Sequence, residues 1–261
     1  MVKKLFCLLY FLNLCFFSFS QMKPDSNFHL YLLAGQSNMA GRGAIAGKFT
    51  DEGNPNIYML NKNDEWVLAK HPLHFDKPAV VGVGPGLAFA LEMLGSDAGI
   101  KIGLIPCAVG GSSINVWKPG AYDSSTKTHP YDDAMARLSL AMRAGVVKGI
   151  LWHQGESDSD PKNAETYLPK LLTLIQAFRD VTHQPNLPFV AGELGTYKEV
   201  YGNINRIIKN LPRQVPFTAV ASSEGLKEKG DMTHFDSPSA EELGKRYAEQ
   251  MKRLQSELKM R

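Results

Sequence analysis

Residues 28–41 read FHLYLLAGQSNMAG, an apolar run that ends in a turn of small and polar residues. The run from Phe28 to Leu33 is short, apolar and rich in strand-forming side chains, which predicts a buried strand. The turn then places Ser37 just beyond the end of that strand. In a parallel sheet, polar groups after the carboxyl ends of strands are where ligands bind. The search for chemistry therefore begins at this turn.

Four further apolar runs repeat the pattern along the chain. They lie at residues 100–108, 148–152, 187–194 and 217–221, and helical patterns lie at 86–94, 131–143, 164–180, 198–210 and 238–258. Alternating strands and helices predict an α/β fold, a three-layer α/β/α sandwich with a mainly parallel, five-stranded sheet. One domain is expected over residues 21–261. Ser237 is expected to cap the last helix, with Pro238 in its first turn.

Composition excludes several classes of protein. The 261 residues are 44% hydrophobic and 21% charged, which is too balanced for a disordered or fibrous chain. The formal net charge is only +3, and the basic residues are scattered among acidic ones. Nucleic-acid binding requires clustered basic side chains, so no nucleic-acid partner is expected.

The first 20 residues differ from the rest of the chain. Lys3 and Lys4 precede an apolar run at residues 5–17 that ends in Ser-Phe-Ser, a pattern typical of a secretory signal peptide. The run is shorter than the roughly 20 residues needed to cross a bilayer. We therefore expect export to the periplasm or the medium, without membrane attachment after cleavage. Cys7 and Cys15 would leave with this segment, so no disulfide framework is expected.

Three more polar motifs lie near the ends of predicted strands or helices. Residues 108–113 read AVGGSS, 152–157 read WHQGES and 231–234 read DMTH. A carboxylate three residues before a histidine can fix its tautomer, while the other ring nitrogen takes a proton from a serine hydroxyl. Asp231 and His234 fit these roles, and His153 is interpreted as a structural or substrate-side residue. No His-Glu-x-x-His or paired-cysteine spacing is present, so neither a metal nor another cofactor is expected.

Together these motifs resemble the SGNH hydrolases, a superfamily with a flavodoxin-like α/β/α fold. GQSNM at 35–39, GGS at 110–112, HQGE at 153–156 and DMTH at 231–234 are most similar to the branch that contains sialate O-acetylesterases and the family 6 carbohydrate esterases, including acetylxylan esterases. The resemblance spans residues 28–258. It implies a carboxylic ester hydrolase in which Ser37 is the nucleophile, His234 the base and Asp231 the residue that orients it.

The resemblance also implies donors for the oxyanion of the tetrahedral intermediate. These are the backbone N–H groups of Ser37 and Gly111 and the side-chain N–H of Gln154, with Gly110 as the alternative to Gly111. Glu156 is expected to support the site by bonding Arg42 or a backbone N–H.

The substrate is the least constrained expectation. An acetylated oligo- or polysaccharide, with acetylxylan first, would stack its sugar rings on surface aromatics at Trp66, Trp117 and Tyr122. A sialate O-acetylesterase, a non-catalytic carbohydrate-binding protein of the same fold and an esterase for longer acyl chains are the alternatives. The sequence leaves open the acetylated hydroxyl and the oligomeric state.

Overall fold

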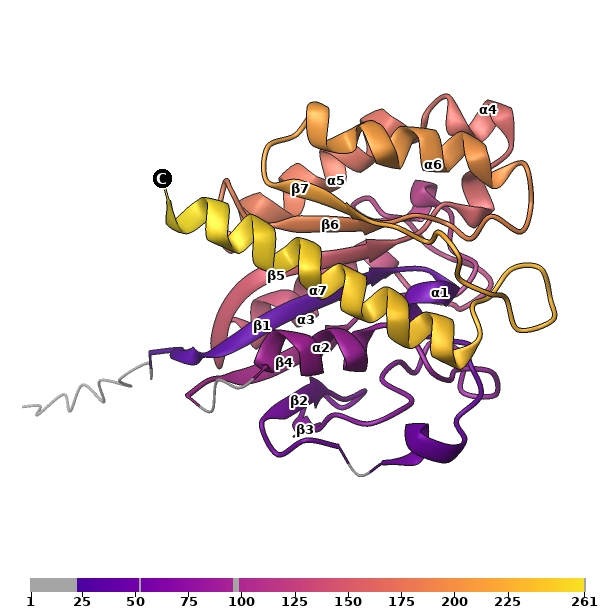
Figure 1. Ribbon diagram of the computed structural model, residues 1–261. Coiled ribbons are helices and arrows are strands. Elements are labelled where there is room, and N and C mark those ends of the chain that lie inside the picture. The colour runs from indigo at the N-terminus through magenta and orange to yellow at the C-terminus, as the bar shows by residue number, and fades with distance from the viewer. Residues whose placement is uncertain (1–22, 52, 96–98, 261) are drawn as a thin grey trace, which may run out of the picture.

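A single sheet organises the computed structural model, which describes residues 23–51, 53–95 and 99–260 (Figure 1). Within these residues the sheet has seven strands in the order β3-β2-β4-β1-β5-β6-β7. Their bounds are β1 (Asp25–Gly35), β2 (Ile57–Leu60), β3 (Trp66–Leu68), β4 (Lys101–Pro106), β5 (Gly145–His153), β6 (Phe189–Gly192) and β7 (Thr218–Ala221). All neighbouring pairs are parallel except β2 and β3. The predicted signal peptide lies outside the described residues.

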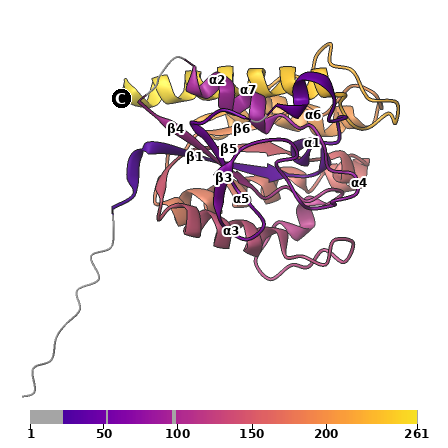
Figure 2. The ribbon, with the colours of Figure 1, turned by 90° about the horizontal axis from the view of Figure 1, so that it is seen from below.

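Helices cover both faces of this sheet. They are α1 (Ser37–Ala40), α2 (Gly86–Leu94), α3 (Pro130–Ala141), α4 (Pro161–Ala164), α5 (Tyr167–Thr182), α6 (Tyr201–Asn210) and α7 (Ser237–Lys259). Figure 2 shows the sheet between a layer with α2 and α7 and a layer with α3 and α5. None of the helices in the described part of the chain combines the length and the apolar character needed to span a membrane.

The central strand β1 explains why two helical layers form. Leu30 and Leu32 are fully buried in a core shared with α3, α5 and α6, whereas Tyr31 and Leu33 are buried in a second core shared with α2 and α7. Successive side chains of a strand point to opposite faces of the sheet. The run from Leu30 to Ala34 is apolar on both faces and must therefore be covered on both sides, which confirms the predicted three-layer architecture.

The sequence analysis missed two strands. The predicted five-stranded sheet has seven strands in the structure because β2 and β3 form an antiparallel hairpin at its edge. These strands span only four and three residues, too few for a reliable apolar pattern.

Two details of the helices also differ from the prediction. The helix expected at 164–180 corresponds to α5, which begins at Tyr167, and a separate short helix, α4, ends at Ala164. The cap of α7 is Asp236, which accepts a hydrogen bond from the backbone N–H of Ser239 at 2.8 Å. Ser237 instead donates its hydroxyl to the carbonyl of Ala44 at 2.6 Å. The aspartate stands one residue earlier and therefore reaches the free N–H groups of the first turn.

The strands β4, β1 and β5 are neighbours in the middle of the sheet, and their carboxyl ends point the same way. Gly35 at the end of β1 is in register with His153 of β5, and Leu33 is in register with Pro106 of β4. Gly35 has φ +128°, and a Cβ there would collide with the backbone of His153. Only glycine fits this close approach of β1 to β5. The loops that follow the three strands therefore begin side by side.

Candidate active site

The structure brings together the three residues expected to form a catalytic triad. Ser37 is the first residue of α1, directly after β1, and its Oγ lies 2.9 Å from Nε2 of His234. Nδ1 of His234 lies 2.7 Å from Oδ2 of Asp231. Both histidine nitrogens are thus within hydrogen-bond distance of the groups that a serine hydrolase requires.

Hydrogen bonds hold Asp231 in its ionised form. Its Oδ1 accepts the backbone N–H groups of Thr233 at 3.0 Å and His234 at 2.8 Å. Partial burial acts to raise the pKa of Asp231, but the hydrogen bonds from the side chain and backbone of His234 outweigh burial and place that pKa below its usual value. The carboxylate therefore accepts the proton on Nδ1, which leaves Nε2 of His234 free to accept the proton of Ser37.

The loop after β4 distinguishes the two candidate glycine donors. The N–H of Gly110 donates to Oδ2 of Asp76 at 2.8 Å, and the same oxygen forms a buried ion pair with Arg42 at 2.7 Å. The N–H of Gly111 has no hydrogen-bond partner among the described residues, and neither does that of Ser37. Free backbone N–H groups can stabilise an oxyanion, whereas an occupied one cannot. The geometry therefore favours Gly111, with φ +84°, over Gly110.

The predicted role of Gln154 does not match the structure. Its side chain is completely buried, and its Nε2 lies within hydrogen-bond distance of three acceptors: Oδ2 of Asp158 at 2.5 Å, the Ser112 carbonyl at 3.0 Å and Oε1 of Gln36 at 3.2 Å. An amide nitrogen has two hydrogens, so none remains for an oxyanion. Gln154 instead links the turn after β1 to the loops after β4 and β5.

Asp158 is a second anchor that the sequence analysis missed. Besides Gln154, it accepts the hydroxyl of Ser113 at 2.6 Å and the backbone N–H of Ile114 at 2.9 Å. It thereby fixes the loop that carries Gly111. Its nearest sequence signal was its position two residues after the HQGE motif, which gave no indication of its partners.

Glu156 was expected to bond Arg42 or a backbone N–H, and the alternative with Arg42 is wrong. Arg42 pairs with Asp76, a residue that no sequence pattern indicated. Oε1 of Glu156 accepts the side-chain amide of Asn38 at 2.6 Å. The pairing follows from position, because Asn38 lies next to Ser37 at the end of β1 and Glu156 lies on the neighbouring loop after β5.

The three aromatic residues expected to bind sugar rings are in different environments. Trp117 is only 3% exposed and donates its indole N–H to Ser112. Trp66 packs on Phe28 with ring centroids 4.8 Å apart, at the amino end of β1 and therefore at the opposite edge of the sheet from Ser37. Tyr122 is 51% exposed. Tyr122 alone of the three remains a candidate for stacking on a sugar.

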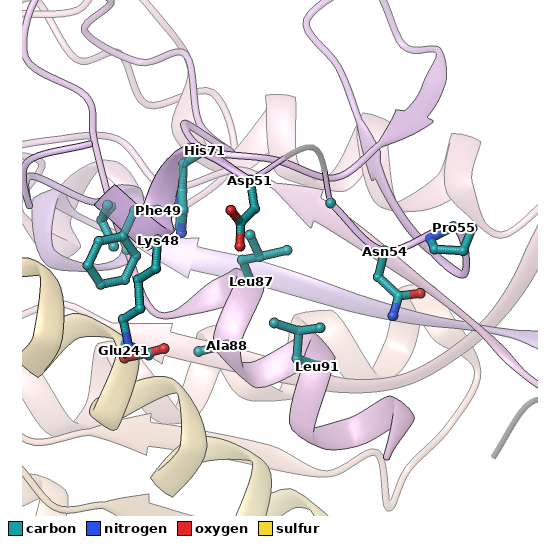
Figure 3. A pocket seen from close by; sticks show the side chains of 13 residues that line it. Lys48, Phe49, Asp51, Asn54, Pro55, His71, Leu87, Ala88, Leu91 and Glu241 are labelled. Carbon is teal, nitrogen blue, oxygen red and sulfur yellow. Dashed lines mark hydrogen bonds and ion pairs between the residues drawn. The ribbon is translucent and has the colours of Figure 1, made fainter. Parts of the chain in front are cut away.

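A cavity of about 350 Å³ lies apart from the triad, between α2 and the segment that precedes β2 (Figure 3). Its floor is formed by Leu87, Ala88 and Leu91, and Lys48 pairs with Glu241 at its side. None of the triad residues lines it. Within the described residues, no group of three or more His, Cys, Asp and Glu side chains is arranged to hold a metal ion.

Comparisons with known proteins agree with this geometry. Residues 27–253 match the family described as "Carbohydrate esterase, sialic acid-specific acetylesterase". The chain belongs to this family. It is therefore a carbohydrate esterase, a type of carboxylic ester hydrolase.

Individual relatives support the same assignment. The chain is 32% identical over 239 residues to the "Probable carbohydrate esterase At4g34215" of Arabidopsis thaliana, covering 82% of this chain and 86% of the relative. The crystal structure of the Arabidopsis protein superposes with a TM-score of 0.78 at 29% identity, covering 88% of this chain and 99% of that one.

Two more distant structures share the fold. NanS has a TM-score of 0.72 at 17% identity, covering 90% of this chain and 99% of that one. XAC1771, a carbohydrate acetylesterase from Xanthomonas citri, has a TM-score of 0.67 at 18% identity, covering 87% of this chain and 57% of that one.

We expect Ser37→Ala and His234→Ala to lower kcat on an acetyl ester by similar large factors. The two residues act as a unit, so the double variant should be little worse than either single variant. Steady-state kinetics on folded proteins measures this. Additive losses, or a folded Ser37→Ala protein with near wild-type activity, would contradict the assignment of the triad.

For Gln154→Ala we expect a lower free energy of unfolding. Removing the amide leaves the buried Asp158 carboxylate and the Ser112 carbonyl without this donor, at a cost of about 1–3 kcal/mol. Denaturant unfolding combined with kinetics measures the effect. A direct oxyanion donor would instead lower kcat by roughly 10²–10³ with unchanged stability, and that result would show that our interpretation is wrong.

Proposed function

We propose that the protein removes acetyl groups from an acetylated saccharide outside the cytoplasm, using Ser37 as the nucleophile. The observation that carries this proposal is the continuous hydrogen-bonded series from Asp231 through His234 to Ser37. The export component rests on the N-terminal sequence alone.

The geometry supplies each step of ester hydrolysis. His234 takes the proton of Ser37 as its oxygen attacks the acetyl carbon, and Asp231 stabilises the imidazolium that forms. The free N–H groups of Ser37 and Gly111 are available to the oxyanion. His234 then gives its proton to the departing sugar hydroxyl. In the second half of the reaction His234 activates a water molecule, which releases acetate and regenerates Ser37.

A non-catalytic sugar-binding role is disfavoured by the same contacts. A binding protein has no need for a carboxylate that orients a histidine toward a buried serine. An esterase for longer acyl chains would require an apolar channel at Ser37, and the apolar cavity in Figure 3 does not include Ser37.

The identity of the sugar that carries the acetyl group is a more specific proposal. Acetylxylan was expected partly because of three aromatics, two of which are buried or remote from the site. A cation near the site instead favours an acidic sugar such as O-acetylated sialic acid. The Nζ of Lys77 lies 3.7 Å from the position that a Cβ on Gly111 would occupy. Lys77 forms no ion pair with the described residues, so its ammonium is available to a carboxylate of the substrate.

Anchoring of the neighbouring residue strengthens this proposal. Asp76 is bonded to both Arg42 and Gly110, so the backbone preceding Lys77 is fixed beside the loop that carries Gly111. A lysine so placed loses less freedom on binding than one on an unanchored loop. Acetylated xylan remains the second candidate.

We predict that the wild-type protein releases acetate faster from O-acetylated sialic acid than from acetylated xylan oligosaccharides at matched acetyl concentration. Lys77→Met should raise KM for the sialic acid by about tenfold, or 1.4 kcal/mol, and leave the neutral xylan oligosaccharide unchanged. Lys162→Met, an exposed lysine on α4, is the matched control.

Three outcomes would revise this proposal. A tenfold preference for xylan would exclude the acidic sugar. Equal losses on both substrates in Lys77→Met would mean that the ammonium acts on the reacting ester rather than on the sugar carboxylate. Faster hydrolysis of a long-chain ester than of an acetyl ester of the same chromogenic alcohol would contradict the acetylesterase proposal itself.

A further inference from the structure

The side chain of Asn38 joins the turn that carries Ser37 to the segment that carries His234. Its Nδ2 donates to the carbonyl of Thr233 at 3.0 Å, and its Oδ1 accepts the N–H of Phe235 at 3.1 Å. These two backbone groups belong to the residues on either side of His234. The Asn38 amide therefore hydrogen-bonds the backbone on both sides of His234.

Glu156 in turn holds Asn38. Its Oε1 accepts the second hydrogen of Nδ2 at 2.6 Å, and its side chain is 4% exposed. With this bond, Asn38 uses both of its donor hydrogens and its acceptor oxygen. Glu156 hydrogen-bonds neither Ser37 nor His234. Among the hydrogen bonds of its side chain, Glu156 therefore reaches the histidine segment only through Asn38.

The hydrogen bonds beside Glu156 determine which ring nitrogen of His153 carries the proton. The hydroxyl of Tyr247 donates its single proton to the carbonyl of Trp152 at 2.8 Å, so it can only accept from Nδ1 of His153, 3.2 Å away. Neutral His153 therefore has its lone pair on Nε2, which lies 3.8 Å from Oε1 of Glu156.

Neither group has another partner that would stabilise a charge. Nε2 of His153 and Oε2 of Glu156 are both buried and have no hydrogen-bond partner among the described residues. An ionised carboxylate here would face a lone pair on one side and have an unsatisfied oxygen on the other, which is costly in a buried site. A protonated carboxyl removes the buried negative charge and its repulsion with the lone pair of His153.

Burial shifts both groups toward their neutral forms. It raises the pKa of Glu156 from 4.5 to about 7, despite the hydrogen bond from Asn38, and it lowers the pKa of His153 to about 3. Of the charged neighbours, Asp158 raises the pKa of Glu156 and Lys198 lowers it. Tyr167 and Tyr247 face the same site and stay neutral because burial raises the pKa of each.

We propose that Glu156 is a positioning residue that acts in its protonated form, holding Asn38 so that the Asn38 amide keeps His234 aligned with Ser37. The proposal extends the esterase function proposed above and rests on it for its kinetic consequence. The protonation of Glu156 can be tested without any substrate.

The pH dependence follows from the direction of the shift. The pKa of Glu156 in the folded protein lies above its ordinary value of 4.5. Its contribution to stability is therefore fully present below about pH 4.5 and is lost as the pH rises through about 7. Ionisation in the folded protein also places a charge beside Asn38, so kcat should decline as the pH rises through about 7.

The variant Glu156→Gln tests whether a neutral side chain is enough at this position. Glutamine keeps an acceptor oxygen for Asn38, but it cannot ionise. We expect kcat within about twofold of wild type at pH 6 and a weaker alkaline decline of both kcat and thermal stability. Glu156→Ala and Asn38→Ala should each lower kcat about tenfold or more, with a double variant little worse. Glu165→Gln, an exposed glutamate, is the matched control and should behave as wild type.

Infrared spectroscopy tests the protonation of Glu156 without a measurement of activity. The wild-type minus Glu156→Gln difference spectrum should contain the C=O stretch of one protonated carboxyl at pH 6, and this band should disappear as the pH rises. Absence of the band, or a Glu156→Gln profile identical to that of wild type, would overturn the claim of protonation. A folded Glu156→Gln protein as inactive as Glu156→Ala would show that the negative charge is needed and would overturn the proposal. Failure of the wild-type protein to cleave acetyl esters would instead refute the proposed function, while the infrared result would stand.

Discussion

The hydrogen bond between Ser37 and His234 joins residues that lie 197 positions apart in the chain. Much of the fold serves to bring these two residues together. The first central strand must end beside the segment that opens the last helix, and this requires β1 to lie in the middle of the sheet with α7 packed across one face. The alternating burial of β1 provides the physical basis, because its two apolar faces recruit separate helical layers and so fix where its carboxyl end emerges.

Buried polar anchors then set the positions of the loops around this bond. Asp76 fixes the loop after β4 from one side through Gly110, and Asp158 fixes it from the other through Ser113. Asn38 fixes the histidine segment. Each anchor satisfies several donors that would be costly to leave unpaired in a buried site. The N–H groups of Ser37 and Gly111 are free within the described chain, and they are the groups that ester hydrolysis can use.

The sequence predicted the parts of this account that are encoded locally. An apolar run followed by GQSN, and a carboxylate three residues before a histidine, carry their meaning within a few residues, so β1 and the triad could be proposed directly. The partners of Gln154 and Glu156 could not, because they depend on which loops meet across the sheet edge. Asp76 lies in a segment without a pattern. The sequence also does not show whether a side chain is buried or exposed. Trp117 could be read as a surface aromatic, but it is buried in the structure.

Covalent labelling of the nucleophile tests the central claim most directly. A fluorophosphonate reacts with a serine only when a neighbouring base activates it, and peptide mass spectrometry then identifies the labelled residue without any assumption about the sugar. The account predicts one adduct, on Ser37, which is lost in His234→Ala and reduced in Asp231→Asn. Labelling at Ser112 or Ser113, or undiminished labelling of Ser37 in His234→Ala, would contradict it.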